Sequence, residues 1–477
     1  MAESLRKKTL NGVAWSALER FSTGGVNFLI GLLLARILMP SDYGLIAMLN
    51  VFIAISRAFI DSGFSTALIR KPNCTEEDNA TVFYFNLVIG AICYALLYIA
   101  APAIARFYDS PQLVEITRVI GLTLFANSFC VVQQAILSIN LNFKALAKIN
   151  LIATVISGVI GVVLAYIGFG VWALVVQTLL SMGIYAALLW VTVKWKPIKS
   201  FSMQSFKTLF SFGSKILVSN LLDTIFANLY TIVIGKRFTS SNLGVYSRAD
   251  QFAKFPSVNI TGIIQRVTFP VLSTIQNEDD RLKTNYRKFL RLSAFVLFPL
   301  MIGMAAVSKP MVLLLLTEKW IDSVPLLQLL CLSMMWYPIH SINLNLLQVK
   351  GRSDLFLKLE IYKKILGLII LFVSMPWGLK AMCYGLIIGS ILSLFLNTHY
   401  TGKLLNMGFF FQMKDLLYSL ISSLLMGLIV YVSISFIPSV WLQLLSGIVI
   451  GILVYTLMAY LFKPMEWKEF VLILKRK

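Results

Sequence analysis

The sequence predicts an all-α integral membrane protein with about 14 transmembrane helices, arranged as two six-helix lobes in a parallel repeat plus two C-terminal helices. Composition is the first reason: 58% of the 477 residues are hydrophobic and 13% are charged, whereas soluble domains have about 45–50% and about 25%. Fourteen spans of about 20 residues would use about 280 positions. Recurrent apolar runs and an internal repeat are the other two reasons. This composition excludes a soluble enzyme, a disordered chain and a single-anchor protein with a large head.

Apolar runs of membrane-spanning length follow one another with short connections. The first run follows Arg6, Lys7 and Lys8 and contains Glu19 and Arg20. Because it is long and lacks a small-residue cleavage site, it is predicted to be a transmembrane helix and not a signal peptide. The predicted spans are residues 13–38, 44–62, 81–105, 116–139, 150–167, 170–193, 208–235, 245–272, 289–308, 323–346, 355–375, 378–400, 414–437 and 440–462.

The distribution of positive charge predicts that both termini are cytoplasmic. The net charge is +21, from 42 Lys and Arg against 21 Asp and Glu. Connections on the side of the N-terminus hold nearly four times as many basic residues as those on the other side, as the positive-inside rule requires. The charge is therefore ascribed to membrane topology, and no nucleic-acid partner is expected.

Few residues are available for metal or cofactor chemistry. The five cysteines are scattered without a CxxC pair, and the chain has two histidines. Neither a zinc site, a haem site nor a disulfide framework is expected. No Walker A motif is present, so an ATP-driven pump is not supported.

Three short segments recur about 200 residues later at equivalent hairpins. The pairs are Asp42–Leu45 with Asn242–Val245, Ser138–Asn142 with Ser341–Asn345, and Gly170–Leu174 with Gly378–Met382. Six helices per repeat give both halves the same orientation, and parallel repeats of this kind place a transport pathway between them.

The repeat also predicts the domain boundaries. The N-terminal lobe is residues 1–197, the C-terminal lobe is residues 198–403, and residues 404–477 form the last two helices and a basic cytoplasmic tail. The basic residues Lys194, Lys196, Lys199 and Lys207 mark the linker between the lobes.

Charged residues inside the spans are functional candidates, because an ionisable group at the bilayer centre costs at least about 2.5–3.5 kcal/mol. Helical spacing aligns four predicted polar stripes that face a shared cavity. They are Ser16, Arg20, Thr23 and Asn27; Asn50, Ala54, Arg57 and Asp61; Ile216, Asn220, Asp223 and Ala227; and Asp250, Lys254, Ser257 and Thr261.

Basic side chains outnumber acidic ones in these spans, which favours an anionic ligand, because guanidinium groups hold phosphate oxygens in a bidentate fork. The basic candidates are Arg20, Arg57, Lys215, Arg248, Lys254 and Arg266. An alternative is that Asp250 and Lys254, and likewise Arg57 and Asp61, neutralise each other one turn apart.

Acidic groups in the same spans are candidates for coupling to Na⁺ or H⁺. These are Asp61, Asp223 and Asp250, with His340 as a further candidate whose alternative role is that of a packed, uncharged side chain. No bound cofactor is expected.

The chain also resembles a known family, the polysaccharide transporter branch of the MOP exporter superfamily. It is most similar to colanic-acid-exporter-type flippases of lipid-linked oligosaccharides. The resemblance rests on Gly12–Ser16, Ala35–Leu38, Asp42–Leu45, Phe269–Leu272, Ile275–Gln276, Glu318–Trp320 and Pro325–Leu330. Relatives use arginines of the first, second and eighth helices to bind pyrophosphate, and Arg20, Arg57 and Arg248 lie on those helices here.

This resemblance implies a flippase that moves undecaprenyl-pyrophosphate-linked oligosaccharide across a bacterial plasma (inner) membrane by alternating access, with an ion gradient as the driving force. The last two helices are implied to form part of a groove for the lipid tail. The product would serve O-antigen, capsule or exopolysaccharide synthesis, and a polysaccharide polymerase and a chain-length regulator are candidate partners. One alternative is a multidrug cation antiporter of the same superfamily, for which an acidic cavity is expected. The other is a membrane enzyme of polysaccharide assembly, for which a larger outer loop with paired acids is expected.

Overall fold

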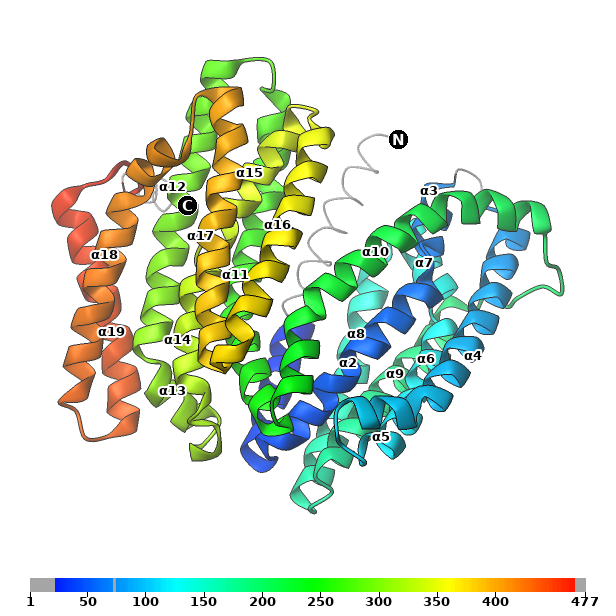
Figure 1. Ribbon diagram of the computed structural model, residues 1–477. Helices are drawn as coiled ribbons and strands as arrows, with labels where there is room; N and C mark the ends of the chain where they lie inside the picture. Colours follow the sequence, from blue (N-terminus) through cyan, green and yellow to red (C-terminus); the bar gives the residue numbers. More distant parts are fainter. Residues whose placement is uncertain (1–21, 72–73, 468–477) are drawn as a thin grey trace. The chain divides into compact units, whose positions relative to one another are not determined.

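A computed structural model describes residues 22–71 and 74–467, and every regular element in these ranges is a helix. The chain divides into two compact units, Met1–Gly244 and Val245–Lys477. Figure 1 shows the helices of each unit packed along one another, with the chain passing through short turns. The predicted all-α fold is confirmed.

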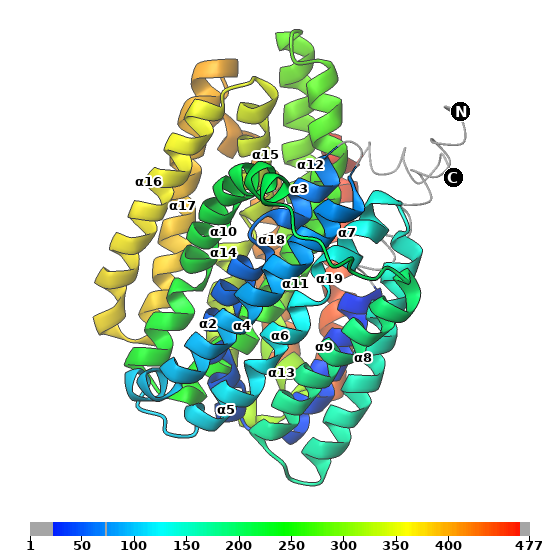
Figure 2. The same cartoon turned by 90° about the vertical axis from the view of Figure 1, so that its right-hand side faces the viewer.

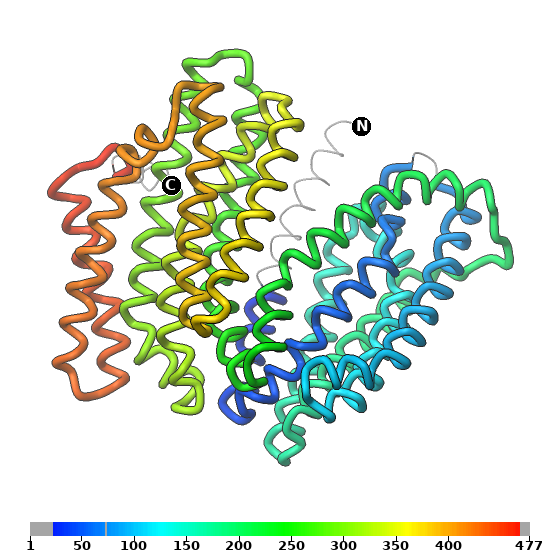
Figure 3. The backbone as a smooth tube through the Cα atoms, viewed as in Figure 1, coloured from blue at the N-terminus to red at the C-terminus, as the bar shows by residue number. Residues whose placement is uncertain are grey.

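The first unit contains a helix over Ser22–Ile37 and nine labelled helices. They are α2 (Pro40–Asp61), α3 (Phe64–Arg70), α4 (Glu76–Phe107), α5 (Leu113–Ile120), α6 (Leu122–Ser128), α7 (Val131–Ile139), α8 (Phe143–Tyr166), α9 (Val171–Val193) and α10 (Met203–Arg237). The long helix α10 bends along its course, as the tube in Figure 3 shows.

The second unit begins within α11 and is built mainly of long helices. They are α11 (Ser240–Thr274), α12 (Asp279–Ala306), α13 (Ser308–Leu315), η1 (Glu318–Trp320), α14 (Ser323–Met334), α15 (Tyr337–Val349), α16 (Ser353–Ser374), η2 (Met375–Trp377), α17 (Leu379–Leu405), α18 (Phe409–Ser435) and α19 (Val440–Phe462). The hairpin partners α16 and α17 lie side by side in Figures 1 and 2.

Each predicted span lies mainly on helix, and the part of the first span before residue 22 lies outside the described residues. Turns divide two of the spans, 116–139 into α5, α6 and α7, and 323–346 into α14 and α15. Within the described ranges, ten helices are long and apolar enough to cross a membrane. The predicted spans that are not among these ten correspond to Ser22–Ile37, to α11, to α14 with α15, and to α16. The helix α11 carries Arg248, Asp250, Lys254 and Arg266, whose charges lower its mean hydropathy.

A break after α2 allows close packing between α2 and α10. Ser62 and Gly63 both have positive φ, of 43° and 68°. A Cβ atom on Gly63 would lie 2.7 Å from the Gly213 carbonyl oxygen, and one on Gly213 would lie 2.6 Å from the Ser62 carbonyl oxygen. The two glycines thus let the backbones meet where side chains would keep them apart.

The predicted span 323–346 is interrupted between α14 and α15. Pro338 occupies the first turn of α15, where it lacks a backbone N–H and its ring disfavours a continuous helix. By contrast, Pro256, Pro270 and Pro299 lie inside α11 and α12, which continue through them.

Two of the three sequence repeats occupy equivalent places in the structure. Asp42–Leu45 lies in the first turns of α2, and Asn242–Val245 lies in the first turns of α11. Gly170 and Gly378 are both N-caps with positive φ, ahead of α9 and α17. These pairs confirm that the corresponding helices begin in the same way.

The third repeat, Ser138–Asn142 with Ser341–Asn345, is wrong as a structural equivalence. The first segment ends α7 and forms the turn into α8, whereas the second lies inside α15. The equivalent turn in the second half is Lys350–Arg352: the Asn142 N–H donates to the Leu137 carbonyl, and the Arg352 N–H donates to the Leu347 carbonyl, both at 2.8 Å. The shared five residues are therefore a chance match.

The first compact unit includes α10, which packs against α2, α3 and α4. The predicted lobe boundaries at residues 197 and 403 stay predictions.

Candidate functional site

In the first unit, the polar stripe predicted on α2 lies on a face that the unit does not cover. Asn50 and Arg57 are exposed and Asp61 is half-buried, while the nearby Val51 and Ile60 are buried. Arg57 and Asp61 form no ion pair with each other in the described part of the chain. The alternative in which they neutralise each other is therefore not supported.

The helix α10 contributes further charges in the same unit. Lys215 and Asp223 are exposed, as is Asn220 between them. The predicted stripe on α10 is thus uncovered by the rest of its unit. Arg20, the remaining basic candidate of this half, lies outside the described residues.

In the second unit, Arg248 is 6% exposed and its guanidinium is held in place by two neighbours. Its Nη1 group donates to Gln251 Oε1 at 2.5 Å, and its Cζ atom lies 5.9 Å from the centroid of the Trp320 ring. Trp320 is fully buried in η1, where the Ser323 hydroxyl donates to its carbonyl at 2.6 Å. A ring face at this distance attracts a cation, so Trp320 is a positioning residue for Arg248.

The pairing predicted as an alternative for Asp250 and Lys254 is confirmed. Lys254 Nζ lies 2.7 Å from Asp250 Oδ2, one turn apart on α11. Arg266, about three turns beyond this pair, is exposed.

The prediction of a polar stripe on α11 is wrong for its last two residues, Ser257 and Thr261. Ser257 and Thr261 are 0% and 1% exposed, and the Ser257 hydroxyl donates to the Met334 carbonyl at 2.8 Å. The four stripe positions on α11 stand 200 residues after those on α2. A slip of one residue in this register rotates a helix by about 100°, which is enough to turn Ser257 and Thr261 into the unit. The exposed polar residues of this helix include Gln251, Lys254 and Arg266.

His340 has the packed role that was its alternative. Its Nε2 atom lies 3.0 Å from Ser390 Oγ, and its Nδ1 atom lies 3.2 Å from Asn397 Nδ2. Both ring nitrogens therefore have partners inside the second unit.

Sequence reasoning missed a buried polar network around Asn343. Asn343 Oδ1 accepts from the Tyr286 hydroxyl at 2.8 Å and from the Thr401 hydroxyl at 2.7 Å, and the Asn343 and Gln412 amides bond to each other. All four side chains are at most 1% exposed. Because they belong to α12, α15, α17 and α18, the network joins four helices, and its role is structural.

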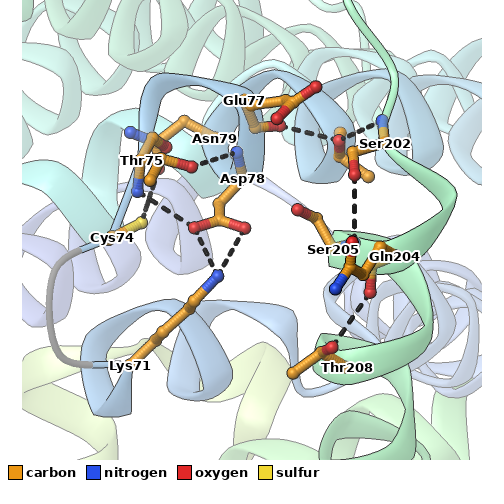
Figure 4. A network of polar contacts seen from close by, with 11 residues as sticks. Lys71, Cys74, Thr75, Glu77, Asp78, Asn79, Ser202, Gln204, Ser205 and Thr208 are labelled. Carbon is orange, nitrogen blue, oxygen red and sulfur yellow. Dashed lines mark hydrogen bonds and ion pairs between the residues drawn. The ribbon is translucent and has the colours of Figure 1, made fainter.

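A second polar network, shown in Figure 4, fastens the start of α4. The carboxylate of Asp78 is fully buried and accepts from Lys71 Nζ at 2.7 Å on each oxygen. Thr75 caps the helix: its hydroxyl accepts from the Asp78 N–H at 3.2 Å, and its own N–H donates to Asp78 Oδ2 at 2.9 Å. This capping box removes unsatisfied donors from the helix end.

The basic linker is held against the same turn of α4. Trp195 Nε1 donates to Glu76 Oε2 at 2.5 Å, and the Ser200 hydroxyl donates to Glu77 Oε1 at 3.0 Å. Farther along, the Ser202 N–H donates to the Thr81 hydroxyl at 3.0 Å. The acidic first turn of α4 thereby fixes the segment that leads into α10.

Among the residues that the structure describes, no three His, Cys, Asp or Glu side chains come together to hold a metal ion. Charged side chains instead lie along the long helices α2, α10 and α11. Charged groups within apolar helices are the feature expected along the pathway of an ion or a substrate, so the class that this fold and these residues suggest is a multi-pass membrane transporter.

Solved structures share this fold. The fold is similar to that of the lipid II flippase MurJ in its inward closed conformation, with a TM-score of 0.70 and 15% identity over 93% of this chain and 98% of that one. It is also similar to an inward-facing multidrug resistance MATE family transporter of the MOP superfamily, with a TM-score of 0.63 and 19% identity over 82% of this chain and 98% of that one. At these identities the likeness concerns the fold.

The chain belongs to the polysaccharide biosynthesis protein family, whose model matches residues 33–325. It is 27% identical to the teichuronic acid biosynthesis protein TuaB of Bacillus subtilis, over 74% of this chain and 73% of that protein. It is 25% identical to the lipopolysaccharide biosynthesis protein WzxC of Escherichia coli, over 83% and 80%, and 25% identical to the succinoglycan biosynthesis transport protein ExoT of Rhizobium meliloti, over 97% and 94%. The resemblance seen in the sequence is confirmed.

The relatives and structural neighbours with a stated activity are transporters, which confirms that the chain is not an enzyme. It is a multi-pass membrane protein and a polysaccharide biosynthesis transport protein similar to ExoT and WzxC.

Proposed function

We propose that the protein is a flippase that moves undecaprenyl-pyrophosphate-linked oligosaccharide from the inner to the outer leaflet of a bacterial plasma membrane. It works by alternating access and serves the synthesis of a surface polysaccharide, with both termini in the cytoplasm. The single observation that carries the proposal is the environment of Arg57.

Arg57 lies on a membrane-spanning helix, exposed, and without an ion pair to the carboxylate one turn away. A guanidinium in that position is costly in hydrocarbon unless it meets water or an anion. Pyrophosphate provides the oxygens that a guanidinium binds in a bidentate manner. Arg57 therefore suits the head of a polyprenyl-diphosphate lipid better than a neutral substrate.

The second unit supports the same ligand chemistry through Arg248. The buried Trp320 ring and Gln251 hold its guanidinium on α11. Lys215 and Arg266 add positive charge on uncovered helix faces, whereas the charge of Lys254 is offset by Asp250. We propose that Arg20, Arg57 and Arg248 bind the diphosphate and that Lys215, Arg266 and, more weakly, Lys254 support them.

Contacts within the second unit leave fewer acidic candidates for ion coupling. Asp250 is paired with Lys254, and His340 is hydrogen-bonded on both nitrogens. Asp61 and Asp223, on α2 and α10, are the remaining candidates for binding Na⁺ or H⁺. The surplus of basic groups disfavours binding of the cationic substrates that a multidrug antiporter would transport.

Reconstitution into vesicles with a fluorescent undecaprenyl-diphosphate oligosaccharide tests the proposal. Arg57→Ala and Arg248→Ala are each expected to slow flipping at least about tenfold, because each removes a charge-assisted contact of about 1.5–3 kcal/mol. Arg352→Ala is the matched control, since Arg352 precedes α16 and is paired with Asp354 at 2.8 Å. Flipping that survives both Arg57→Ala and Arg248→Ala would overturn the site. A wild-type protein that moves a cationic dye but no lipid-linked sugar would overturn the function.

Substitution of Trp320 separates positioning from packing. Trp320→Phe keeps an aromatic face beneath Arg248 and is expected to retain most flipping, whereas Trp320→Leu keeps apolar volume without that face and is expected to slow flipping about fivefold. The same vesicle assay measures both. Equal rates for the Phe and Leu variants would show that Trp320 acts only in packing.

A further inference from the structure

A pocket of about 120 Å³ opens in the second unit where the beginning of α12 meets the segment after α19. Thr284, Arg287, Lys288 and Arg291 of α12 line one side, and Met465 and Glu466 line the other. The positions on α12 follow helical spacing, so the four side chains share one face. The positive-inside pattern predicts that this end of the unit is cytoplasmic.

A buried carboxylate below the pocket fixes the two arginines. Asp415 of α18 is 3% exposed in its side chain and accepts from Arg287 Nε and Nη2, both at 2.8 Å. The same carboxylate accepts a short hydrogen bond from Arg291 Nη2. A bidentate pair of this kind fixes the plane of the guanidinium, so both cations are oriented before any ligand arrives.

Donors remain after this pairing. Arg291 Nε is buried and has no hydrogen-bond partner among the described residues; Glu466 Oε1 lies 3.7 Å away, too far for a hydrogen bond. Asp415 engages two of the three nitrogens of Arg287, whose side chain is 34% exposed. A buried donor without an acceptor is costly, so the wall of the pocket is suited to an added acceptor.

Basic side chains predominate in the lining of the pocket. Arg287, Lys288 and Arg291 line it, and Glu466 is the one carboxylate among the described residues of the lining. A lining of this composition attracts an anion.

An apolar surface adjoins the polar pocket. At the end of α19, Tyr460, Leu461 and Phe462 are 61%, 64% and 71% exposed, and Met465 at the pocket is 60% exposed. Basic pockets between transmembrane helices at the cytoplasmic surface bind anionic lipid headgroups. The uncovered side chains provide the surface on which acyl chains of such a lipid would lie.

From this arrangement we infer that the pocket binds the phosphate group of an anionic phospholipid of the inner leaflet. The phosphate oxygens accept hydrogen bonds from Arg291 and Arg287 and face Lys288, while the acyl chains lie along the end of α19. The site is separate from Arg57, Arg248 and the other candidates for the transported lipid. Its occupancy does not depend on the proposed flippase activity.

Native mass spectrometry of the full chain in detergent tests the site, with short-chain phosphatidylglycerol as the probe. Lys288→Gln is expected to weaken binding about fivefold, and Glu466→Gln is expected to strengthen it by a similar factor, because each changes one charge at the pocket. Lys358→Gln, on α16 and outside the pocket, is the matched control and is expected to leave binding unchanged. Arg287 and Arg291 are left intact because they hold Asp415.

Short-chain phosphatidylcholine and inorganic phosphate complete the experiment. Weaker binding of the zwitterionic lipid than of phosphatidylglycerol is expected, as is weak binding of free phosphate, which lacks acyl chains. Equal binding of the two lipids, phosphate binding as tight as that of phosphatidylglycerol, or no effect of Lys288→Gln and Glu466→Gln would each overturn the inference. Flipping assays on the same variants in neutral-lipid vesicles show separately whether transport is altered.

Discussion

The buried carboxylates Asp78 and Asp415 lie near the beginnings of α4 and α18, in different units, and are neutralised in different ways. Asp78 is paired with one lysine seven positions away and accepts from the backbone of Thr75. Asp415 is paired with two arginines more than 120 positions away. The first arrangement joins the end of α3 to the beginning of α4, which are adjacent in the chain. The second joins helices that are distant in the chain.

The comparison shows that a buried carboxylate can have two different effects. It can neutralise a single cation, or it can orient several cations toward an open pocket. At Asp78 one positive charge meets one negative charge, and both carboxylate oxygens are used by Lys71 and the helix cap. At Asp415 one carboxylate orients two guanidinium groups beside an open pocket, where Arg291 Nε has no hydrogen-bond partner among the described residues. A buried ion pair alone therefore does not reveal the role of the carboxylate. The number of its cationic partners distinguishes the two roles here.

The largest effect is expected from Asp415→Asn. Two guanidinium groups would lose their shared carboxylate, and breaking a buried pair costs about 3–5 kcal/mol. Denaturant titration of the protein in mild detergent measures the free energy of unfolding. Asp354→Asn, which removes an exposed partner of Arg352, is the control and should leave the unfolding transition in place; a similarly small effect of Asp415→Asn would show that Asp415 is not a clamp.

A smaller loss, of about 1–3 kcal/mol, is expected from Asp78→Asn. Lys71 is 30% exposed in its side chain and can turn to water after its partner is neutralised, which the less accessible Arg291 does less readily. The same titration measures the change, and limited trypsin digestion at Lys194, Lys196 and Lys199 reports whether the linker loosens. If Asp78→Asn costs more than Asp415→Asn, the comparison between local and long-range pairing is wrong.

Arg287→Lys is expected to cost about 1 kcal/mol, because an ammonium group keeps the charge but loses the bidentate geometry. Lysine suffices at Asp78, so this substitution asks whether it also suffices at Asp415. Unfolding of the variant is compared with that of Arg281→Lys, whose arginine forms an exposed pair with Glu278 at 2.7 Å. Identical stability of the two variants would remove the distinction between a guanidinium and an ammonium partner.

The smallest effect concerns the thiol beside Asp78. Burial, followed by the charge of Asp78, raises the pKa of Cys74 to about 11, so the thiol is protonated at pH 8 and reacts slowly with iodoacetamide. Asp78→Asn removes the nearby negative charge, lowers the pKa and should speed alkylation a few-fold at that pH, as measured by peptide mass spectrometry. Asp415→Asn serves as the control, and unchanged labelling in Asp78→Asn would show that Asp78 does not act on this thiol.

The helices could be predicted from the sequence because apolar runs of spanning length are a strong local signal. Their interruptions were harder to predict. The break at Ser62 and Gly63 depends on close approach to Gly213 of α10, a contact between residues far apart in the chain. The chance likeness of Ser138–Asn142 to Ser341–Asn345 shows that short repeats locate helices only when they begin or end them in the same way.

Some features of the candidate site could be predicted from the same kind of local signal. Arg57 and Arg248 stood out as charges in apolar helices, and helical spacing was enough to pair Asp250 with Lys254. No periodicity connects Arg248 with Trp320, although a tryptophan in a short connection between helices was a signal that could have been weighed. The pairing of Asp415 with Arg287 and Arg291 could not be predicted, because the arginines lie on another helix more than 120 residues away in the chain.

The two glycines of the first repeat pair, Gly44 in Asp42–Leu45 and Gly244 in Asn242–Val245, have one further consequence. A Cβ atom on Gly44 would lie 1.8 Å from the Ser240 carbonyl oxygen, and one on Gly244 would lie 1.8 Å from the Pro40 carbonyl oxygen. Each glycine thus lies against the residue that begins the other glycine's helix. Such a reciprocal contact is the self-complementary pattern of a two-fold interface between identical chains. A chain that arose by tandem duplication would keep such an ancestral homodimer contact within itself, and neither glycine could then be replaced while the other helix stays in place.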